Sequence, residues 1–186
     1  MLAYSSIAHA GYMLLAIPTM SGDGIYAIML YLLVYLFMNL GAFFVVIEIK
    51  NKTKGESFDD YKGLGWEMPL VGAIMTLFMV SLTGLPPTAG FVGKFYIFAS
   101  LINAGESFYW LVVAGGINSV ISLYYYLRVV KVMYFEGEKN ETISFPSKII
   151  TGMLVLTALP TLFLGIYWVP ITDWIDRSLV FFIQTI

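Results

Sequence analysis

The chain contains no cysteine and a single histidine, and only 12% of its 186 residues are charged. Without cysteine it can form no disulfide, no thiolate metal site and no cysteine-ligated iron–sulfur cluster. One histidine cannot build a multi-histidine metal or haem site. Any redox chemistry connected with this chain must therefore take place on another subunit, and we expect the chain itself to hold no cofactor and no metal.

Charged residues are scarce because apolar residues dominate the composition. Hydrophobic types make up 59% of the sequence and the mean hydropathy is +0.83, whereas soluble domains carry roughly 25% charged residues. The formal net charge of -2 offers no basic patch to neutralise phosphates, so we expect no nucleic-acid partner. The composition predicts an all-α protein of the lipid bilayer, built as a polytopic bundle of transmembrane helices.

About five apolar segments along the chain read as membrane spans, each of which takes about 20 helical residues, although the first is short for a span. They cover residues 4–18, 25–49, 68–104, 108–135 and 149–169. We expect residues 1–169 to form one transmembrane domain. Residues 170–186 are expected to form an interfacial tail, because several polar and aromatic side chains follow one another there: Asp173, Trp174, Asp176 and Arg177.

Basic residues alternate between successive loops. The loop after the second segment carries Lys50, Lys52, Lys54 and Lys62, and the loop after the fourth carries Lys139, flanked by Arg128, Lys131 and Lys148. The loops after the first and third segments contain neither lysine nor arginine. Because basic loops stay in the cytoplasm, this pattern predicts a multi-pass protein of the cell's inner (plasma) membrane, with its N-terminus cytoplasmic and its C-terminus outside.

The third segment is too long for one straight helix, since at ~1.5 Å per residue it would extend about 55 Å across a hydrocarbon core of about 30 Å. Its middle reads TGLPPTAG, in which Pro86 and Pro87 remove two amide donors between Gly84 and Gly90. The pattern predicts two half-helices joined by a non-helical break. Such breaks are tolerated at membrane depth only inside protein or beside a wet cavity, and transporters use them to build ion sites.

Lys94 is the only charged residue between Glu67 and Glu106, about one turn into the second half-helix. A charge near the membrane centre costs at least about 2.5–3.5 kcal/mol on insertion scales, and such residues are generally functional. The alternative is a packing kink with a lysine that snorkels to the interface. Because Lys94 lies well inside its segment, we favour a role in proton transfer.

Polar residues of the first segment recur at spacings of three and four, which can place them on one helical face: Ser5, Ser6, His9 and Tyr12. Histidine exchanges a proton near physiological pH, so His9 is a second candidate for proton transfer. A histidine that only bonds neighbouring helices is the alternative. In the fourth segment, Asn118 and Tyr124 are candidates to support the same path.

Four stretches carry a resemblance to a known family: LAYSSIAHAGYMLL, FDDYKGLGWEMP, SLTGLPPTAGFVGKFYIF and INSVISLYYYLRVVKVMYF. They resemble the antiporter-like membrane subunits of respiratory complex I and the related Mrp antiporters and membrane-bound hydrogenases. The YYYLR run and a lysine at position 94 are most similar to the subunit N branch of NADH–quinone oxidoreductase. The resemblance implies two inverted repeats, each with one broken helix, and the chain is expected to be the second, C-terminal repeat.

On this resemblance, Lys94 matches the ionisable position of the second broken helix, and His9 a polar position lining the second half-channel. The implied function is a proton-translocating subunit of an NADH–quinone oxidoreductase, with Lys94 as the proton-loading site of the outward half-channel. The NADH, FMN, iron–sulfur and quinone sites would lie on partner subunits of the respiratory membrane complex. An Mrp-type Na⁺/H⁺ antiporter or membrane-bound hydrogenase subunit is one alternative, and a structural membrane subunit without transport is another.

Overall fold

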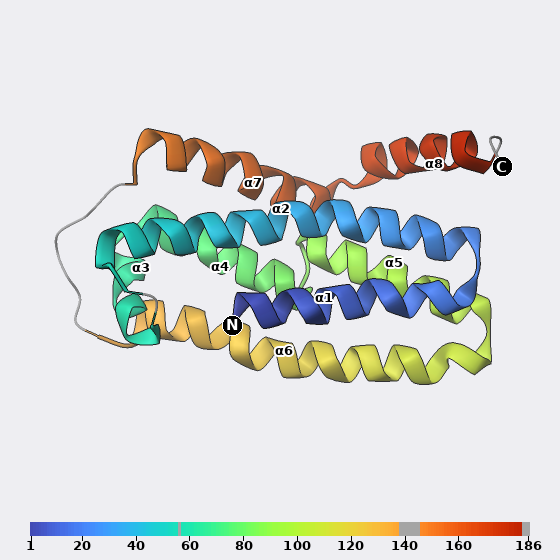
Figure 1. Ribbon diagram of the computed structural model, residues 1–186, viewed down its shortest axis with the longest axis horizontal. Coiled ribbons are helices and arrows are strands. Elements are labelled where there is room, and N and C mark those ends of the chain that lie inside the picture. The colour runs from blue at the N-terminus through green and yellow to red at the C-terminus, as the bar shows by residue number, and fades with distance from the viewer. Residues whose placement is uncertain (56, 138–145, 184–186) are drawn as a thin grey trace.

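The computed structural model describes residues 1–55, 57–137 and 146–183 of the chain, with side chains up to residue 179. These residues form helices and turns without any β-strand, which confirms the all-α prediction. The long helices run side by side along one axis (Figure 1): α1 (Leu2–Ala16), α2 (Gly22–Thr53), α4 (Pro69–Thr83), α5 (Ala89–Ala104), α6 (Tyr109–Phe135) and α7 (Lys148–Ile166). Short elements connect them: η1 (Ile17–Thr19), η2 (Phe58–Tyr61), α3 (Leu64–Glu67) and η3 (Glu106–Phe108).

The helices follow the order of the five predicted segments, but their lengths differ. Within the described residues, three helical segments are each long and apolar enough to cross a membrane: α2, Glu106–Phe135 and α7. The helices Phe58–Glu67 and Pro69–Thr83 meet at a bend of 118°, and together they add a fourth span if the bent pair is one span. Helix α1 has 15 residues, fewer than the ~20 that span a bilayer. The third predicted segment is divided between α4 and α5, which lie end to end (Figure 1).

Helix α2 forms the centre of the bundle and packs against α1, α4, α5, α7 and α8 (Val169–Ile183). One face of it is fully buried, through side chains three or four residues apart: Ala27, Leu30, Tyr31, Val34, Met38, Ala42, Val45 and Ile49. Because lipid is as apolar as these side chains, close van der Waals packing and interhelical hydrogen bonds hold the helices together, rather than exclusion of water. The buried polar residues between the helices are therefore the ones to inspect for a functional site.

The predicted break in the third segment is observed between α4 and α5. Helix α4 ends at Gly84, whose φ of +87° is readily adopted only by glycine, and the peptide bond between Pro86 and Pro87 is cis. Helix α5 begins after Thr88, whose hydroxyl donates to the carbonyl of Leu85 at 2.6 Å. The backbone N–H of Gly90 donates to the Ser81 hydroxyl at 3.1 Å, so the two half-helices are tied together across the break.

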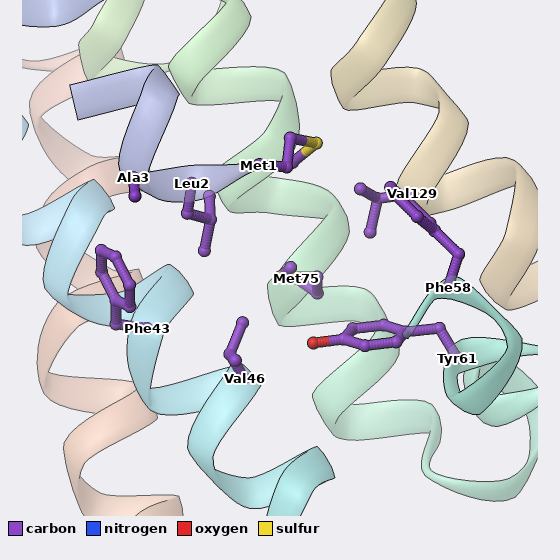
Figure 2. A pocket seen from close by; sticks show the side chains of 9 residues that line it. All are labelled: Met1, Leu2, Ala3, Phe43, Val46, Phe58, Tyr61, Met75 and Val129. Carbon is purple, nitrogen blue, oxygen red and sulfur yellow. The ribbon is translucent and has the colours of Figure 1, made fainter. Parts of the chain in front are cut away.

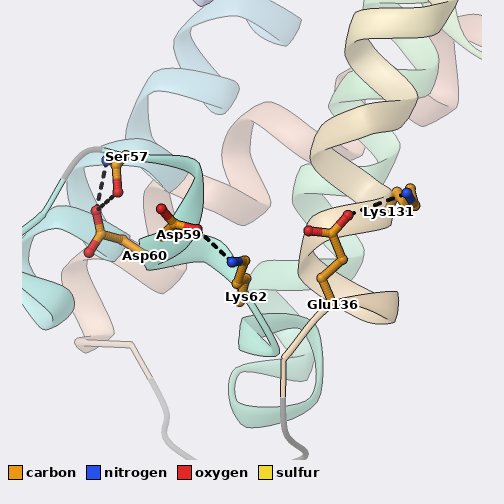
Figure 3. A network of polar contacts seen from close by, with 6 residues as sticks. All are labelled: Ser57, Asp59, Asp60, Lys62, Lys131 and Glu136. Atoms are coloured by element: carbon orange, nitrogen blue, oxygen red, sulfur yellow. Dashed lines mark hydrogen bonds and ion pairs between the residues drawn. The ribbon is translucent and has the colours of Figure 1, made fainter.

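Basic residues gather at the end of the bundle where α2 ends, α6 ends and α7 begins (Figure 1). Ion pairs join Lys52 to Glu67 at 2.5 Å, and Lys62 to Asp59 and Lys131 to Glu136 across the surface (Figure 3). Lys139 lies outside the described residues. The opposite end carries Asp23 and Glu106 instead. The described basic residues of the two predicted basic loops therefore lie at the same end of the bundle.

Ser57 caps the turn η2 through the carboxylate of Asp60 (Figure 3). The Ser57 hydroxyl and the Ser57 backbone N–H each donate to Oδ2 of Asp60 at 2.7 Å, and these bonds lower the pKa of Asp60 below its usual value. A lowered pKa means that the cap stabilises the turn above the usual pKa of aspartate and is lost as the pH falls through the folded-state pKa.

We expect the Ser57→Ala substitution to raise the pKa of Asp60 toward its usual value, because the hydroxyl donor is removed. Carbonyl NMR of ¹³C-aspartate-labelled protein in detergent would follow this titration. The Ser147→Ala variant, which removes the cap of α7 instead, should leave Asp60 unchanged. A titration of Asp60 that is the same in both variants would contradict the assignment of the cause to Ser57.

The predicted tail begins within α8, which continues the line of α7 along α2 (Figure 1). Ile175 is fully buried and packs with Leu30 of α2 and Val92 of α5. Residues 184–186 of the tail lie outside the described residues. The boundary at residue 169 and the interfacial position of the tail stay predictions.

Candidate functional site

Lys94 projects from the first turns of α5 into the break and is only 4% exposed. Its ammonium donates to the backbone carbonyls of Thr83 at 2.8 Å and Leu82 at 3.3 Å. These carbonyls belong to the last turn of α4, where helix geometry leaves carbonyls without intrahelical partners and the helix dipole favours a positive charge. The break therefore supplies the acceptors that a buried ammonium requires.

A second set of contacts joins Lys94 to α6 and α1. The ammonium donates to the Ser119 hydroxyl at 3.2 Å and lies 4.4 Å from the centre of the Tyr12 ring, a cation–π distance. The Tyr12 hydroxyl donates to the carbonyl of Gly115 at 3.0 Å and lies 2.7 Å from Ser119 Oγ. Because Tyr12 has one hydroxyl hydrogen, Ser119 is then the donor to Tyr12. Asn118 donates its amide to the Tyr12 oxygen at 3.2 Å.

His9 forms the second polar group and is 1% exposed. Its Nδ1 lies 2.6 Å from the hydroxyl of Tyr31 on α2, and its Nε2 lies 3.1 Å from the hydroxyl of Tyr126 on α6. The Tyr126 hydroxyl also hydrogen-bonds the hydroxyl of Ser5. A neutral imidazole has one donor and one acceptor nitrogen, so one tyrosine donates to the ring and the other accepts from it. Such an arrangement can hold or relay a proton.

Tyr12 is the common neighbour of the two groups. Its ring lies under the ammonium of Lys94 and has its centre 6.0 Å from the centre of the His9 ring. Among the residues that the structure describes, no hydrogen bond runs directly between Lys94 and His9. Lys94 and His9 are thus both neighbours of one tyrosine.

The structure brings together Lys94, His9, Tyr12 and Asn118 from the predicted set. The predicted residues of the break lie beside them, since a Cβ atom at Gly84 would be 2.7 Å from Cδ of Lys94. Two predicted residues lie elsewhere. The Ser6 hydroxyl donates to the carbonyl of Leu2 on its own helix, and Tyr124 is 76% exposed on α6. The roles of all these residues in function stay predictions.

The sequence analysis missed three members of the network: Tyr31, Ser119 and Tyr126. For Tyr126 a signal was available, because Ser119, Ser122 and Tyr126 are spaced three, four and seven residues apart and share one helical face. Tyr124 does not share that spacing. Tyr31 lies in a continuous apolar run, where spacing carries little information about which face is buried.

A cavity of about 270 Å³ opens between the starts of α1 and η2 and the helices α2, α4 and α6 (Figure 2). Its lining side chains are apolar except for Tyr61, and none of the lining residues belongs to the polar network: Met1, Leu2, Ala3, Phe43, Val46, Phe58, Tyr61, Met75 and Val129. The described part of the chain contains no cluster of three or more His, Asp or Glu side chains that would hold a metal ion.

A family described as the transmembrane region of NADH:quinone oxidoreductase and Mrp antiporters matches residues 1–122. NADH-quinone oxidoreductase subunit N 2 of Sorangium cellulosum is 49% identical, over 96% of this chain and 36% of that protein. Subunit N of Chlorobium chlorochromatii is 46% identical over the same two shares. The chain therefore spans about a third of the length of the curated relatives it matches.

Two solved structures contain a similar chain. In respiratory complex I from Thermus thermophilus with bound aureothin, the similarity covers 89% of this chain and 37% of that one, with 34% identity and a TM-score of 0.70. In the archaeal membrane-bound sulfane sulfur reductase, it covers 96% of this chain and 36% of that one, with 27% identity and a TM-score of 0.85. Both similar chains belong to respiratory membrane complexes.

Proposed function

Because the chain belongs to the NADH:quinone oxidoreductase/Mrp antiporter transmembrane family, we propose that it is part of a proton-translocating membrane subunit of an NADH–quinone oxidoreductase. Lys94 is the proton-loading site in this proposal. The enzyme activity belongs to the whole complex: NADH, FMN, iron–sulfur clusters and quinone are bound by partner subunits, and this chain contributes the path of the proton.

The observation that carries the proposal is the environment of the Lys94 ammonium. It is buried, yet it contacts only neutral acceptors: two carbonyls of the break and the hydroxyl of Ser119. No carboxylate of the described residues forms an ion pair with it. A buried lysine locked to a carboxylate would keep its proton permanently, whereas neutral dipoles can solvate the amine in both protonation states.

The contacts of Lys94 indicate how a proton could leave it. Ser119 accepts from Lys94 and donates to Tyr12, so a hydroxyl chain leads from the amine into α6 and α1. A positive charge moved close to Lys94 by another part of the complex would repel its proton toward Ser119 and Tyr12. Because the Tyr12 hydroxyl itself donates to the carbonyl of Gly115, water would carry the proton onward. His9 is bonded to Tyr31 and Tyr126, and its ring centre lies 6.0 Å from that of Tyr12. It is the proposed next acceptor or the donor that reloads Lys94.

The proposed setting is the inner (plasma) membrane, with other membrane subunits as partners. The basic end of the bundle in Figure 1 would face the cytoplasm, because basic loops are retained there. In this orientation α1 runs from within the bundle toward the end with Asp23 and Glu106, which faces outward. The outward half-channel then runs from Lys94 toward these acidic residues.

Lys94→Arg tests the proposal, since arginine keeps the positive charge but holds its proton too tightly to release it. We expect NADH-driven proton translocation to be about tenfold slower, or about 1.4 kcal/mol in the barrier. The measurement is acidification of inside-out vesicles containing the assembled complex, in sodium-free buffer. Lys54→Arg, at an exposed position, should leave the rate unchanged.

An unchanged rate in Lys94→Arg would contradict the proposed function. Translocation that occurs only when Na⁺ is present would instead favour the alternative function, a Na⁺/H⁺ antiporter subunit of the same family. Both outcomes are read from one set of vesicles, by adding NaCl to half of them.

A further inference from the structure

A stripe of polar side chains runs along α2 toward the basic end of the bundle. Tyr31, Tyr35 and Asn39 are each four residues apart and therefore lie on one face of the helix. The first two both contact His9: the hydroxyl of Tyr31 bonds its Nδ1 at 2.6 Å, and the ring of Tyr35 stacks on the imidazole with centres 4.9 Å apart. Asn39 lies one turn farther from His9.

Two oxygen atoms of this stripe are buried without a hydrogen-bond partner. They are the hydroxyl oxygen of Tyr35 and the side-chain carbonyl oxygen of Asn39. In the described part of the chain, the only other atom in this condition is Nζ of Lys52, which lies 2.5 Å from the carboxylate of Glu67. Buried polar atoms are nearly always bonded to protein or to ordered water, so each of these two oxygens calls for a hydrogen-bond partner.

The chemistry of the two oxygens identifies that partner as water. The Asn39 oxygen accepts hydrogen bonds, and the Tyr35 hydroxyl both accepts and donates them. Neither is charged, so the pair would not retain a cation against its hydration shell. A small neutral molecule that both donates and accepts fits both atoms, and water fills this role in protein interiors where several polar partners converge.

We propose that Tyr35 and Asn39 bind ordered water that extends the hydrogen-bonded network of His9 toward the basic end of the bundle. The next residue of the stripe is Phe43, four residues beyond Asn39, and it lines the cavity of about 270 Å³ together with Leu2 and Val46 (Figure 2). The cavity thus lies beyond Asn39 on the same face of α2, and the proposed water would extend toward it. The role of the water in reloading His9 and Lys94 rests on the proposed function, whereas its binding does not.

An experimental structure of the assembled complex, at a resolution that shows individual waters, tests the binding site directly. We expect solvent density within hydrogen-bonding distance of the Tyr35 hydroxyl and of the Asn39 side-chain oxygen. Absence of solvent density at both atoms would overturn the inference. A side chain from another segment or subunit bonded to them would overturn it as well.

The transport role is tested with a Tyr35→Phe/Asn39→Leu double variant. Phenylalanine keeps the ring that stacks on His9, so only the polar atoms are lost. We expect NADH-driven proton translocation to be several-fold slower. The matched control is Tyr109→Phe/Asn51→Leu, which makes the same changes at exposed positions and should pump normally.

Comparison with Lys94→Leu separates the two hypotheses. If Lys94→Leu stops translocation and the double variant pumps normally, the proposed function stands and the transport role of the water is overturned. If Lys94→Leu pumps normally, the proposed function fails, while solvent density at Tyr35 and Asn39 would still support the water site.

Discussion

Replacement of Lys94 by leucine is expected to abolish proton translocation while the complex still assembles. A positioned group that takes up and releases a proton contributes about 10²–10⁴-fold to a rate, so we expect a loss of at least ~100-fold. Leucine carries no exchangeable proton, and it leaves the Ser119 hydroxyl without its donor. The measurement is NADH-driven acidification of inside-out vesicles, normalised to the amount of assembled complex.

The structural alternative makes the opposite prediction for the same variant. Replacing a buried charge by an apolar side chain of similar length is often neutral or stabilising, so a lysine that only packs a kink could be lost without consequence. We therefore expect the melting temperature of the purified complex to change little in Lys94→Leu. Lost transport in a complex of unchanged stability would then be due to the missing amine. Lys54→Leu is the control, and normal pumping by Lys94→Leu would contradict the proposed function.

The break and its lysine could be read from the sequence because each depends on local chemistry. Two consecutive prolines between glycines cannot continue a helix in any environment, and a lone charge in an apolar segment needs acceptors. The break supplies them: the last turn of α4 turns two backbone carbonyls toward Lys94. The sequence indicates that such acceptors are needed, but not that Leu82 and Thr83 provide them.

The partners of His9 depend on which face of each helix is buried, and here the prediction was incomplete. At roughly 100° per residue, Ser5 and Tyr12 lie on the same side of His9, whereas Ser6 lies on the other side. The structure buries Ser5, His9 and Tyr12 and leaves Ser6 partly exposed. The angles around the helix therefore predict that Ser6 faces away from Ser5 and Tyr12, whereas a spacing of three or four residues alone does not.

Two features, the orientation of Tyr31 and the packing of α8, could not be predicted from the sequence. Apolar residues lie on every face of α2, so its hydropathy pattern does not say that Tyr31 turns toward α1 and bonds His9. Polar residues in α8 suggest an interfacial segment, yet Ile175 packs it against α2 and α5. Both features are set by tertiary packing between helices that are distant in sequence, which composition and periodicity do not encode.

Gly90→Ala is expected to be the most damaging small substitution at the break. A Cβ atom at this position would lie 1.8 Å from the carbonyl oxygen and 2.7 Å from the carbonyl carbon of Ser81, which are backbone atoms of α4. The methyl group can be accommodated only if the two half-helices move apart. Overpacking of this kind typically costs about 1–3 kcal/mol, so we expect a clear fall in the melting temperature of the complex.

The same movement would draw the carbonyls of Leu82 and Thr83 away from Lys94, because they follow Ser81 directly in α4. Proton translocation by Gly90→Ala should therefore fall about tenfold or more, even in the fraction that stays assembled. Gly152→Ala is the matched control: it lies in α7 with no atom within 4 Å of the new methyl group, and alanine favours a helix by about 0.5–1 kcal/mol. If both variants melt and pump alike, the close approach at Gly90 does not hold Lys94 in place, and the acceptors of its ammonium must be fixed by contacts elsewhere in the complex.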